Sequence, residues 1–166
     1  MMSHHTTQTP ARRDRLLKQS HPDVYRSDRK PHEPSLCKIC GAVFTSGRWQ
    51  WLETLPESAE EMRCPACQRI HDRLPAGYLT LQGEFFEAHR DEIMRLVHHH
   101  VERQRLQHPL QRIIESRPLA GGGIEISFTE YHLPKGVGEA VKHAYQGELR
   151  IQFAEESGQE RVSWER

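Results

Sequence analysis

Two short cysteine motifs decide how this sequence folds: Cys37-Lys38-Ile39-Cys40 and Cys64-Pro65-Ala66-Cys67. Each is a C-x2-C pair, and 23 residues separate the two pairs. The chain can turn tightly at each pair, so that two sulfurs face one ion while an intervening hairpin brings the second pair opposite the first. Gly41, directly after Cys40, allows the open backbone angles of such a turn. The spacing predicts a zinc ribbon with one structural Zn2+ per chain, bound by Cys37, Cys40, Cys64 and Cys67.

Other chemistries use the same residue type. Two disulfides are disfavoured because nothing in the sequence indicates an oxidising compartment. A thioredoxin-like site needs a single C-x-x-C pair on a βαβ unit, whereas here two matched pairs share one segment. An iron–sulfur cluster also takes four thiolates, and the sequence does not exclude it. A thiol or metal enzyme is a further alternative, but no Walker loop, G-x-S-x-G or H-E-x-x-H motif occurs, so we expect no enzymatic activity.

The sequence after the second cysteine pair changes its hydrophobic period twice. Phe86, Ile93, Val97 and Val101 recur at helical spacing, which predicts a long helix over residues 83–108 that ends before Pro109. The remainder alternates between strand and helix patterns. We expect strands at residues 112–117, 124–128, 149–153 and 162–164, and a helix that begins near Pro134 and ends at Gly147.

These patterns predict an α+β fold: a four-cysteine zinc ribbon, a long linking helix and a small β-β-α-β-β domain. A helical crossover would make the strands at 124–128 and 149–153 parallel neighbours. We expect four segments along the chain. They are a basic, disordered arm over residues 1–36, the zinc ribbon over 37–82, the helix over 83–108 and the small α/β domain over 109–166.

Composition and charge limit the function classes. The chain has 166 residues, with 23 Lys+Arg against 23 Asp+Glu, which excludes a uniformly basic binder. The balance nevertheless runs from +3 in residues 1–36 through 0 in 37–82 to −3 in 83–166. Apolar residues make up 36%, which favours small cores supported by a metal. No run reaches the roughly 18–20 apolar residues of a membrane span, and the N-terminus has no secretory pattern, so we expect a cytoplasmic protein without a membrane partner.

Basic and aromatic residues near the cysteines suggest contacts with RNA. Arg48 stands beside Trp49 and Trp51, a combination that can pair with phosphate or stack on bases. The structural alternative is that one tryptophan closes the ribbon core and the other packs on the long helix. The N-terminal arm is equally consistent with a solvated segment that has no partner. The candidate RNA-binding residues are Arg48, Trp49, Arg63, Arg69 and Arg73 in the ribbon, and Arg12, Arg13 and Arg15 in the arm.

The same motifs resemble those of a family of small, uncharacterised bacterial zinc-ribbon proteins. More remotely, the layout is similar to the N-terminal zinc-binding part of the archaeal and eukaryotic adaptor that exports the large ribosomal subunit. This second likeness implies a ribosomal partner, by analogy only. The resemblance spans about residue 12 to the end and rests on residues 37–44, 47–51, 64–70, 72–77, 108–110, 132–133 and 143–149.

The leading hypothesis is therefore a non-enzymatic zinc-ribbon protein that binds RNA or the ribosome. The alternative is a protein–protein interaction adaptor in which the ribbon is purely structural. Binding to RNA would weaken with salt, whereas a protein partner would survive nuclease and high salt.

Overall fold

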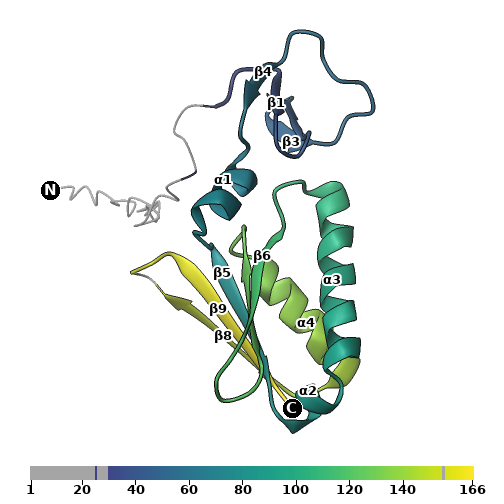
Figure 1. Ribbon diagram of the computed structural model, residues 1–166, viewed down its shortest axis with the longest axis vertical. Helices are drawn as coiled ribbons and strands as arrows, with labels where there is room; N and C mark the ends of the chain where they lie inside the picture. The colour runs from purple at the N-terminus through teal and green to yellow at the C-terminus, as the bar shows by residue number, and fades with distance from the viewer. Residues whose placement is uncertain (1–24, 26–29, 155) are drawn as a thin grey trace, which may run out of the picture.

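The computed structural model describes residue 25, residues 30–154 and residues 156–166. Over these residues the protein is α+β, with two sheets and four helices (Figure 1). The predicted arm over residues 1–36 lies mostly outside the described residues, and so do Arg12, Arg13 and Arg15. Within the described part, no helix is both long enough and apolar enough to span a bilayer.

The smaller sheet carries the first cysteine pair. It consists of β1 (Ser35–Cys37), β2 (Val43–Thr45), β3 (Arg48–Gln50) and β4 (Glu60–Met62) in the order β3-β2-β1-β4. β2 is antiparallel to β1 and β3, while β4 runs parallel to β1. Helix α1 (Pro65–Asp72) follows β4 and carries the second pair. We call β1–β4 with α1 the ribbon.

The β2–β3 hairpin turns at Ser46 and Gly47, whose φ angles of 54° and 75° are both positive. Positive φ at both central residues gives a turn whose twist matches that of the flanking strands. The Glu33 carboxylate accepts hydrogen bonds from both backbone N–H groups, at 2.8 and 3.1 Å. This turn places Arg48 at the hairpin tip.

The larger sheet has five strands in the order β6-β7-β5-β9-β8. They are β5 (Gly77–Gln82), β6 (Ile113–Pro118), β7 (Ile124–Phe128), β8 (Glu148–Ala154) and β9 (Gln159–Glu165). β9 is parallel to β5, and every other neighbouring pair is antiparallel. With α2 (Glu84–Ala88), α3 (Arg90–Gln107) and α4 (Leu133–Tyr145) these strands form what we call the larger unit.

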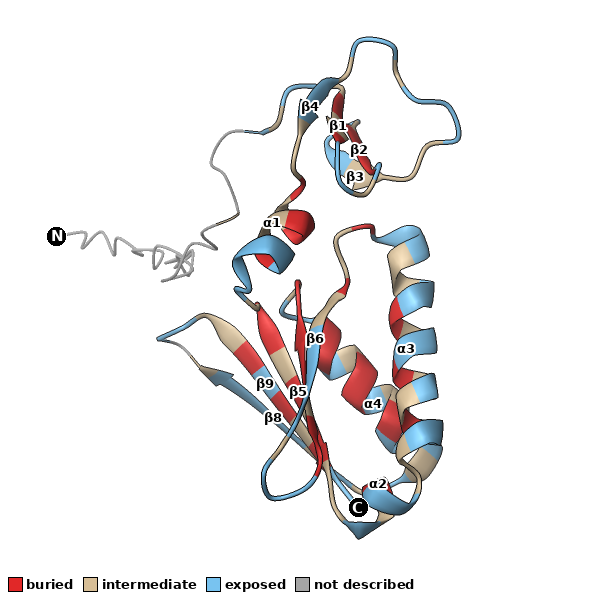
Figure 2. Cartoon of the chain, in the orientation of Figure 1, coloured by how far each residue is buried: buried red, intermediate tan, exposed pale blue. Residues whose placement is uncertain are grey.

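The core of the larger unit lies between the sheet and its helices. α4 packs on the sheet and α3 packs alongside α4, so one face is covered (Figures 1 and 2). Ile93, Val97 and Val101, the stripe predicted from the sequence, are buried in this core. The helix predicted over 83–108 is divided at His89 into α2 and α3. Since α3 contributes to the core, it is an integral element of the larger unit and more than a linker.

Two expectations about connectivity are wrong. The strands at 124–128 and 149–153 are not neighbours, because β5 and β9 lie between β7 and β8. β5 comes from residues 77–82, which the sequence analysis assigned to the ribbon. Leu79 and Leu81 on β5 are fully buried in the larger core, and this burial is what draws the segment into the larger sheet.

Candidate metal centre

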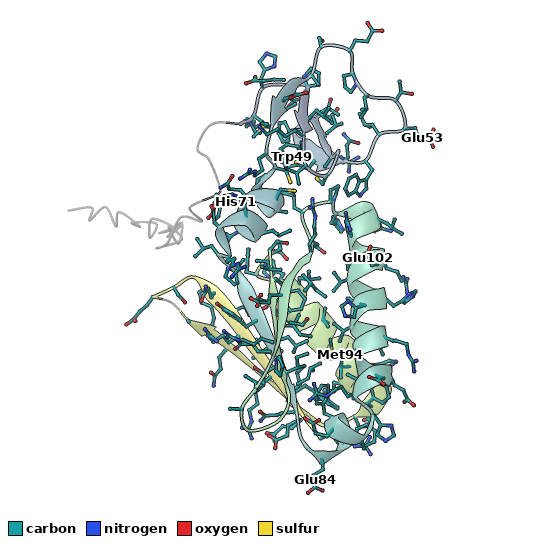
Figure 3. All side chains as sticks on the ribbon, in the orientation of Figure 1. Trp49, Glu53, His71, Glu84, Met94 and Glu102 are labelled. Atoms are coloured by element: carbon teal, nitrogen blue, oxygen red, sulfur yellow. The ribbon has the colours of Figure 1, made fainter. Side chains whose placement is uncertain are left out.

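Four cysteine thiols meet at the junction of the ribbon and the larger unit. Cys37 ends β1 and Cys40 lies in the turn toward β2. Cys64 caps the N-terminus of α1, and Cys67 lies in its first turn. The four Sγ atoms are within 4.8 Å of one another, so these residues are positioned to bind a metal ion. Figure 3 shows the sulfur atoms close to Trp49, between the small sheet and α1.

Local backbone structure points each pair of sulfurs the same way. In the first pair the N–H of Gly41 donates to the carbonyl of Cys37, and the N–H of Cys37 donates to the carbonyl of Ala42, both at 2.8 Å. Gly41 has a φ of 80°, a conformation that glycine adopts without strain. In the second pair the Cys64 sulfur accepts the N–H of Cys67 at 3.4 Å. The two turns therefore present their thiols on one side.

The sulfur geometry fits a tetrahedral ion. A four-thiolate zinc site with Zn–S bonds of about 2.3 Å has sulfur–sulfur edges of about 3.8 Å. The Sγ atoms of Cys40 and Cys64 are 3.8 Å apart. A disulfide would need about 2.05 Å, and all four cysteines are free thiols. The donor set, four sulfurs with no carboxylate, suits zinc or an iron–sulfur cluster and does not suit magnesium or calcium.

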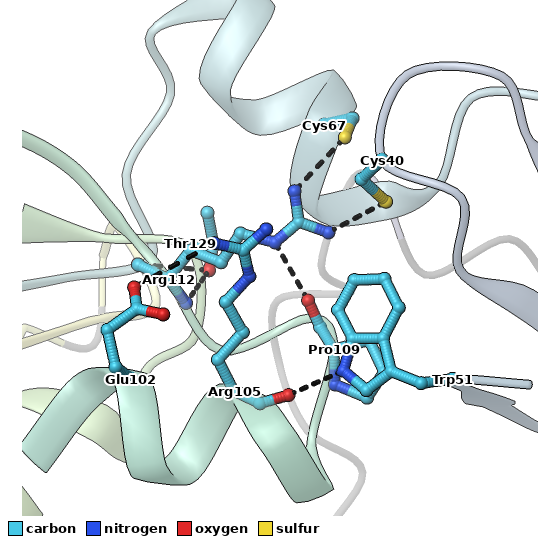
Figure 4. Close-up of polar contacts among 8 residues, drawn as sticks. All are labelled: Cys40, Trp51, Cys67, Glu102, Arg105, Pro109, Arg112 and Thr129. Atoms are coloured by element: carbon cyan, nitrogen blue, oxygen red, sulfur yellow. Dashed lines mark hydrogen bonds and ion pairs between the residues drawn. The ribbon is translucent and has the colours of Figure 1, made fainter. Parts of the chain in front are cut away.

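A buried arginine of the larger unit completes the site. Arg112, just before β6, is 8% exposed. Its Nη1 donates to Cys67 Sγ at 3.2 Å, and its Nη2 donates to Cys40 Sγ at 3.0 Å (Figure 4). Nη2 also donates to Cys64 Sγ at 3.6 Å. Its Nε donates to the carbonyl of Pro109 at 2.8 Å. One guanidinium thus contacts three of the four sulfurs.

These contacts shift the ionisation of the cluster. Hydrogen bonds from Cys64, from the backbone of Ala42 and from Arg112 lower the pKa of the Cys40 thiol to about 4, although burial opposes them. The bond with Cys40, together with burial, raises the pKa of Cys64. Burial also raises the pKa of Cys67, and Arg112 counteracts it. The pKa of Arg112 is raised by its bonds to Cys67 and Cys40 against the effect of its own burial, so the guanidinium stays charged.

The tryptophans help to attach the ribbon. Trp51 Nε1 donates to the carbonyl of Arg105 at 2.8 Å, near the end of α3, and the Arg105 guanidinium lies 5.7 Å from the Trp51 ring centre (Figure 4). Trp49 packs against Phe44, with ring centroids 5.5 Å apart, and against the cysteine cluster. Trp49 thus packs in the ribbon core and Trp51 packs against α3, as in the structural alternative to RNA stacking.

The five predicted RNA-binding residues of the ribbon differ in exposure. Arg48 and Arg73 are exposed, but Arg63 is half-buried and donates to Gln68 at 3.3 Å. Arg69 is only 7% exposed, and its Nη1 donates to the carbonyl of Leu74 at 3.0 Å. Trp49 is half-buried in the packing described above. Of the five candidates that lie in the described part of the chain, Arg48 and Arg73 are therefore the two with an exposed cationic group for a partner.

Arg73 lies beside a set of residues that sequence reasoning missed. A polar cavity of about 130 Å³ is lined by Arg73, Pro75, Tyr78, Glu115, Arg117, Glu125 and Ser127. Tyr78 alternates along β5 with the buried Leu79, so it projects from the sheet face opposite the helices. Arg112 was missed as well, because an isolated arginine 45 residues after Cys67 carries no local signal. The sequence signal that could have found Tyr78 is the alternation of apolar and polar residues over residues 77–82, which places Tyr78 on the face opposite the buried leucines.

Comparisons of this chain with protein-family models, with curated proteins and with solved structures returned no match. The resemblance to bacterial zinc-ribbon proteins and to the export adaptor therefore stays a prediction. The fold and the metal centre rest on the geometry of this chain.

Proposed function

We propose that Cys37, Cys40, Cys64 and Cys67 hold one structural zinc ion. The observation that carries this proposal is the close approach of four free thiols, three of which accept hydrogen bonds from a buried arginine. Four thiolates around zinc leave no open coordination position, so the ion supplies folding energy and no catalysis. Metal analysis of reduced protein tests the proposal. Zinc at one per chain is expected, and iron with a visible charge-transfer band contradicts it.

We further propose that the protein is a non-enzymatic RNA-binding protein that uses the open face of the larger sheet. The open face is defined as the side opposite α3 and α4, around Tyr78, Arg117, Glu125 and Arg161, together with the adjoining Arg73. An aromatic ring on a sheet face that none of the described helices covers can stack on a base of single-stranded RNA, while arginines contact phosphates.

Two of the arginines on the open face are paired with Glu125, so the positive charge available to an anionic partner is small. Glu125 pairs with Arg117 at 2.6 Å and with Arg161 at 3.7 Å. The Arg161 guanidinium also lies over the Tyr78 ring, 4.2 Å from its centre. Arg73 is exposed at the rim of the cavity, and Arg48 at the hairpin tip offers a second exposed cation. A base that stacks on Tyr78 would displace Arg161 toward the phosphate backbone.

The experiment measures binding of a mixed-sequence single-stranded RNA and cosedimentation with purified ribosomes at several salt concentrations. Arg73→Gln should weaken binding and reduce the slope of log K against log salt by about 0.7 for each phosphate that the protein no longer neutralises. Lys142→Gln, an exposed charge on α4 at the helical face, is the matched control and should leave binding unchanged. A wild-type chain that binds neither RNA nor ribosomes at low salt contradicts the proposal.

A second proposal is a protein-binding adaptor, which the edge of the larger sheet favours. β8 is an edge strand, and its Ile151 and Phe153 are 44% and 57% exposed. Exposed apolar residues on an unpaired edge suit the addition of a strand from another protein. A complex with a purified protein partner that survives nuclease and high salt, and that Phe153→Lys disrupts, would favour this function over RNA binding.

A further inference from the structure

The metal centre is built from both units of the protein. The ribbon supplies the four sulfurs, and the larger unit supplies Arg112 from the segment that leads into β6. Leu110, from the same segment, packs against the cysteine cluster. The site therefore lies at an interface, although all four sulfur ligands come from the ribbon.

The surroundings of Arg112 make the sulfurs its counter-ions. A buried guanidinium is costly unless it is paired and hydrogen-bonded. Among the described residues, the structure gives Arg112 no ion pair with a carboxylate, and its side-chain N–H groups go to three sulfurs and one carbonyl. Four thiolates around a divalent ion carry a net charge of −2, which a nearby cation offsets. The charges of the two units thus complement each other only when the sulfurs are anionic.

The backbone of Arg112 is held as firmly as its side chain. The Thr129 hydroxyl accepts the N–H of Arg112 at 2.9 Å, and the N–H of Thr129 donates to the carbonyl of Arg112 at 3.0 Å. Thr129 directly follows β7, an inner strand of the larger sheet. The guanidinium is therefore fixed relative to the sheet, and its N–H groups are already directed at the sulfurs.

We infer that Arg112 is a positioning residue for the metal centre, which couples retention of the metal to docking of the ribbon on the larger unit. The inference rests on the metal site of the proposed function and adds a role for a residue that binds no metal. Loss of the metal would no longer hold the sulfurs in the positions that Arg112 contacts, so the buried guanidinium would lose these hydrogen bonds. The interface should then loosen around residues 108–113 as well as in the ribbon.

The first experiment measures zinc affinity of the full chain by competition with a chromophoric chelator. Arg112→Gln should weaken affinity by about 10- to 100-fold, the usual effect of removing a partner that orients metal ligands. Arg112→Lys, which keeps the charge but loses the planar fork, should fall between Gln and wild type. Arg150→Gln, at an exposed arginine of β8 that pairs with Glu148, is the control and should retain wild-type affinity.

Cobalt(II) adds a readout that a purely structural role would not move. Substitution of Co2+ gives a thiolate-to-metal absorption band, and the loss of N–H···S bonds in Arg112→Gln should shift its energy. A wild-type affinity and an unshifted band in Arg112→Gln would overturn the inference while leaving the metal site intact. Failure of the wild-type chain to bind zinc or cobalt would overturn both the proposed metal site and the role of Arg112.

Amide hydrogen exchange of the wild-type chain tests the coupling without a variant, and decides the matter if Arg112→Gln does not fold. Removal of metal by a chelator should raise exchange in residues 108–113 and in the ribbon, while the central strands β5 and β7 stay protected. A change confined to the ribbon would overturn the inference.

Discussion

Replacing Thr129 by valine removes a hydroxyl group that holds the segment carrying Arg112. Thr129 is 6% exposed, and its hydroxyl donates to the carbonyl of Leu110 at 2.6 Å while accepting the N–H of Arg112 at 2.9 Å. Valine has nearly the same shape, so the packing is kept and both backbone groups lose this partner. Each buried group left unpaired costs about 1–3 kcal/mol. Leu110 is only half-buried, so the total cost for the two groups lies near the lower end of this range.

We expect Thr129→Val to lower the free energy of unfolding by about 2–3 kcal/mol. For a chain of this size that corresponds to a fall in melting temperature of roughly 5–10 °C. Urea unfolding of the zinc-loaded protein, followed by circular dichroism, measures the change. Chelator competition on the same sample should show weaker zinc retention, because Arg112 is no longer held in register.

Thr129→Ser is the matched control, since serine keeps the hydroxyl and loses only one methyl group. It should cost about 1 kcal/mol, as expected for a small buried deletion. If Thr129→Val were as stable as Thr129→Ser and held zinc equally well, the hydroxyl would not position Arg112 and the reasoning would be refuted.

Three further substitutions probe the larger unit. Gly136→Ala on α4 should stabilise the protein by up to about 1 kcal/mol through helix propensity, because the nearest atom to the added methyl group is 3.7 Å away. Gly138→Ala should instead destabilise the protein by about 1 kcal/mol net, because the added methyl group would lie 2.9 Å from Leu149 Cδ1 and from Val162 Cγ1 and this overpacking outweighs the gain in helix propensity. If both variants moved the melting temperature in the same direction, the result would be inconsistent with this packing. Burial raises the pKa of Glu160, and its Oε2 has no hydrogen-bond partner among the described residues. The protonated Glu160 side chain therefore contributes stability that is fully present below the ordinary glutamate pKa. This stability is lost as the pH rises through the raised pKa. Glu160→Gln should therefore gain stability over wild type between pH 4 and pH 7 in urea unfolding, and a pH-independent difference would contradict this.

The metal centre and several elements could be predicted because their signals are local. Each cysteine pair turns within four residues, so the spacing alone indicates which sulfurs converge. The alternating pattern of β7 and the helical pattern of α4 likewise lie within single segments, and both elements appear where they were expected. The class, α+β, follows from these patterns.

The long-range pairings could not be predicted for physical reasons. Residues 77–82 begin only ten positions after Cys67, and the burial of Leu79 and Leu81 in a distant core is what assigns β5 to the larger sheet. The parallel partner of β5 is β9, which lies near the other end of the chain. Arg112 reaches Cys40 across 72 residues, a contact that depends on how two folded units dock.

We propose above all that four thiolates hold one zinc ion at the junction of the ribbon and the larger unit. Native mass spectrometry of the reduced full chain, combined with titration of accessible thiols, tests it most directly. We predict a mass increase that corresponds to one zinc per chain, and four thiols that react with a thiol reagent only when a chelator releases the metal. A metal-free chain that remains folded, with four thiols that react at once, would contradict the claim.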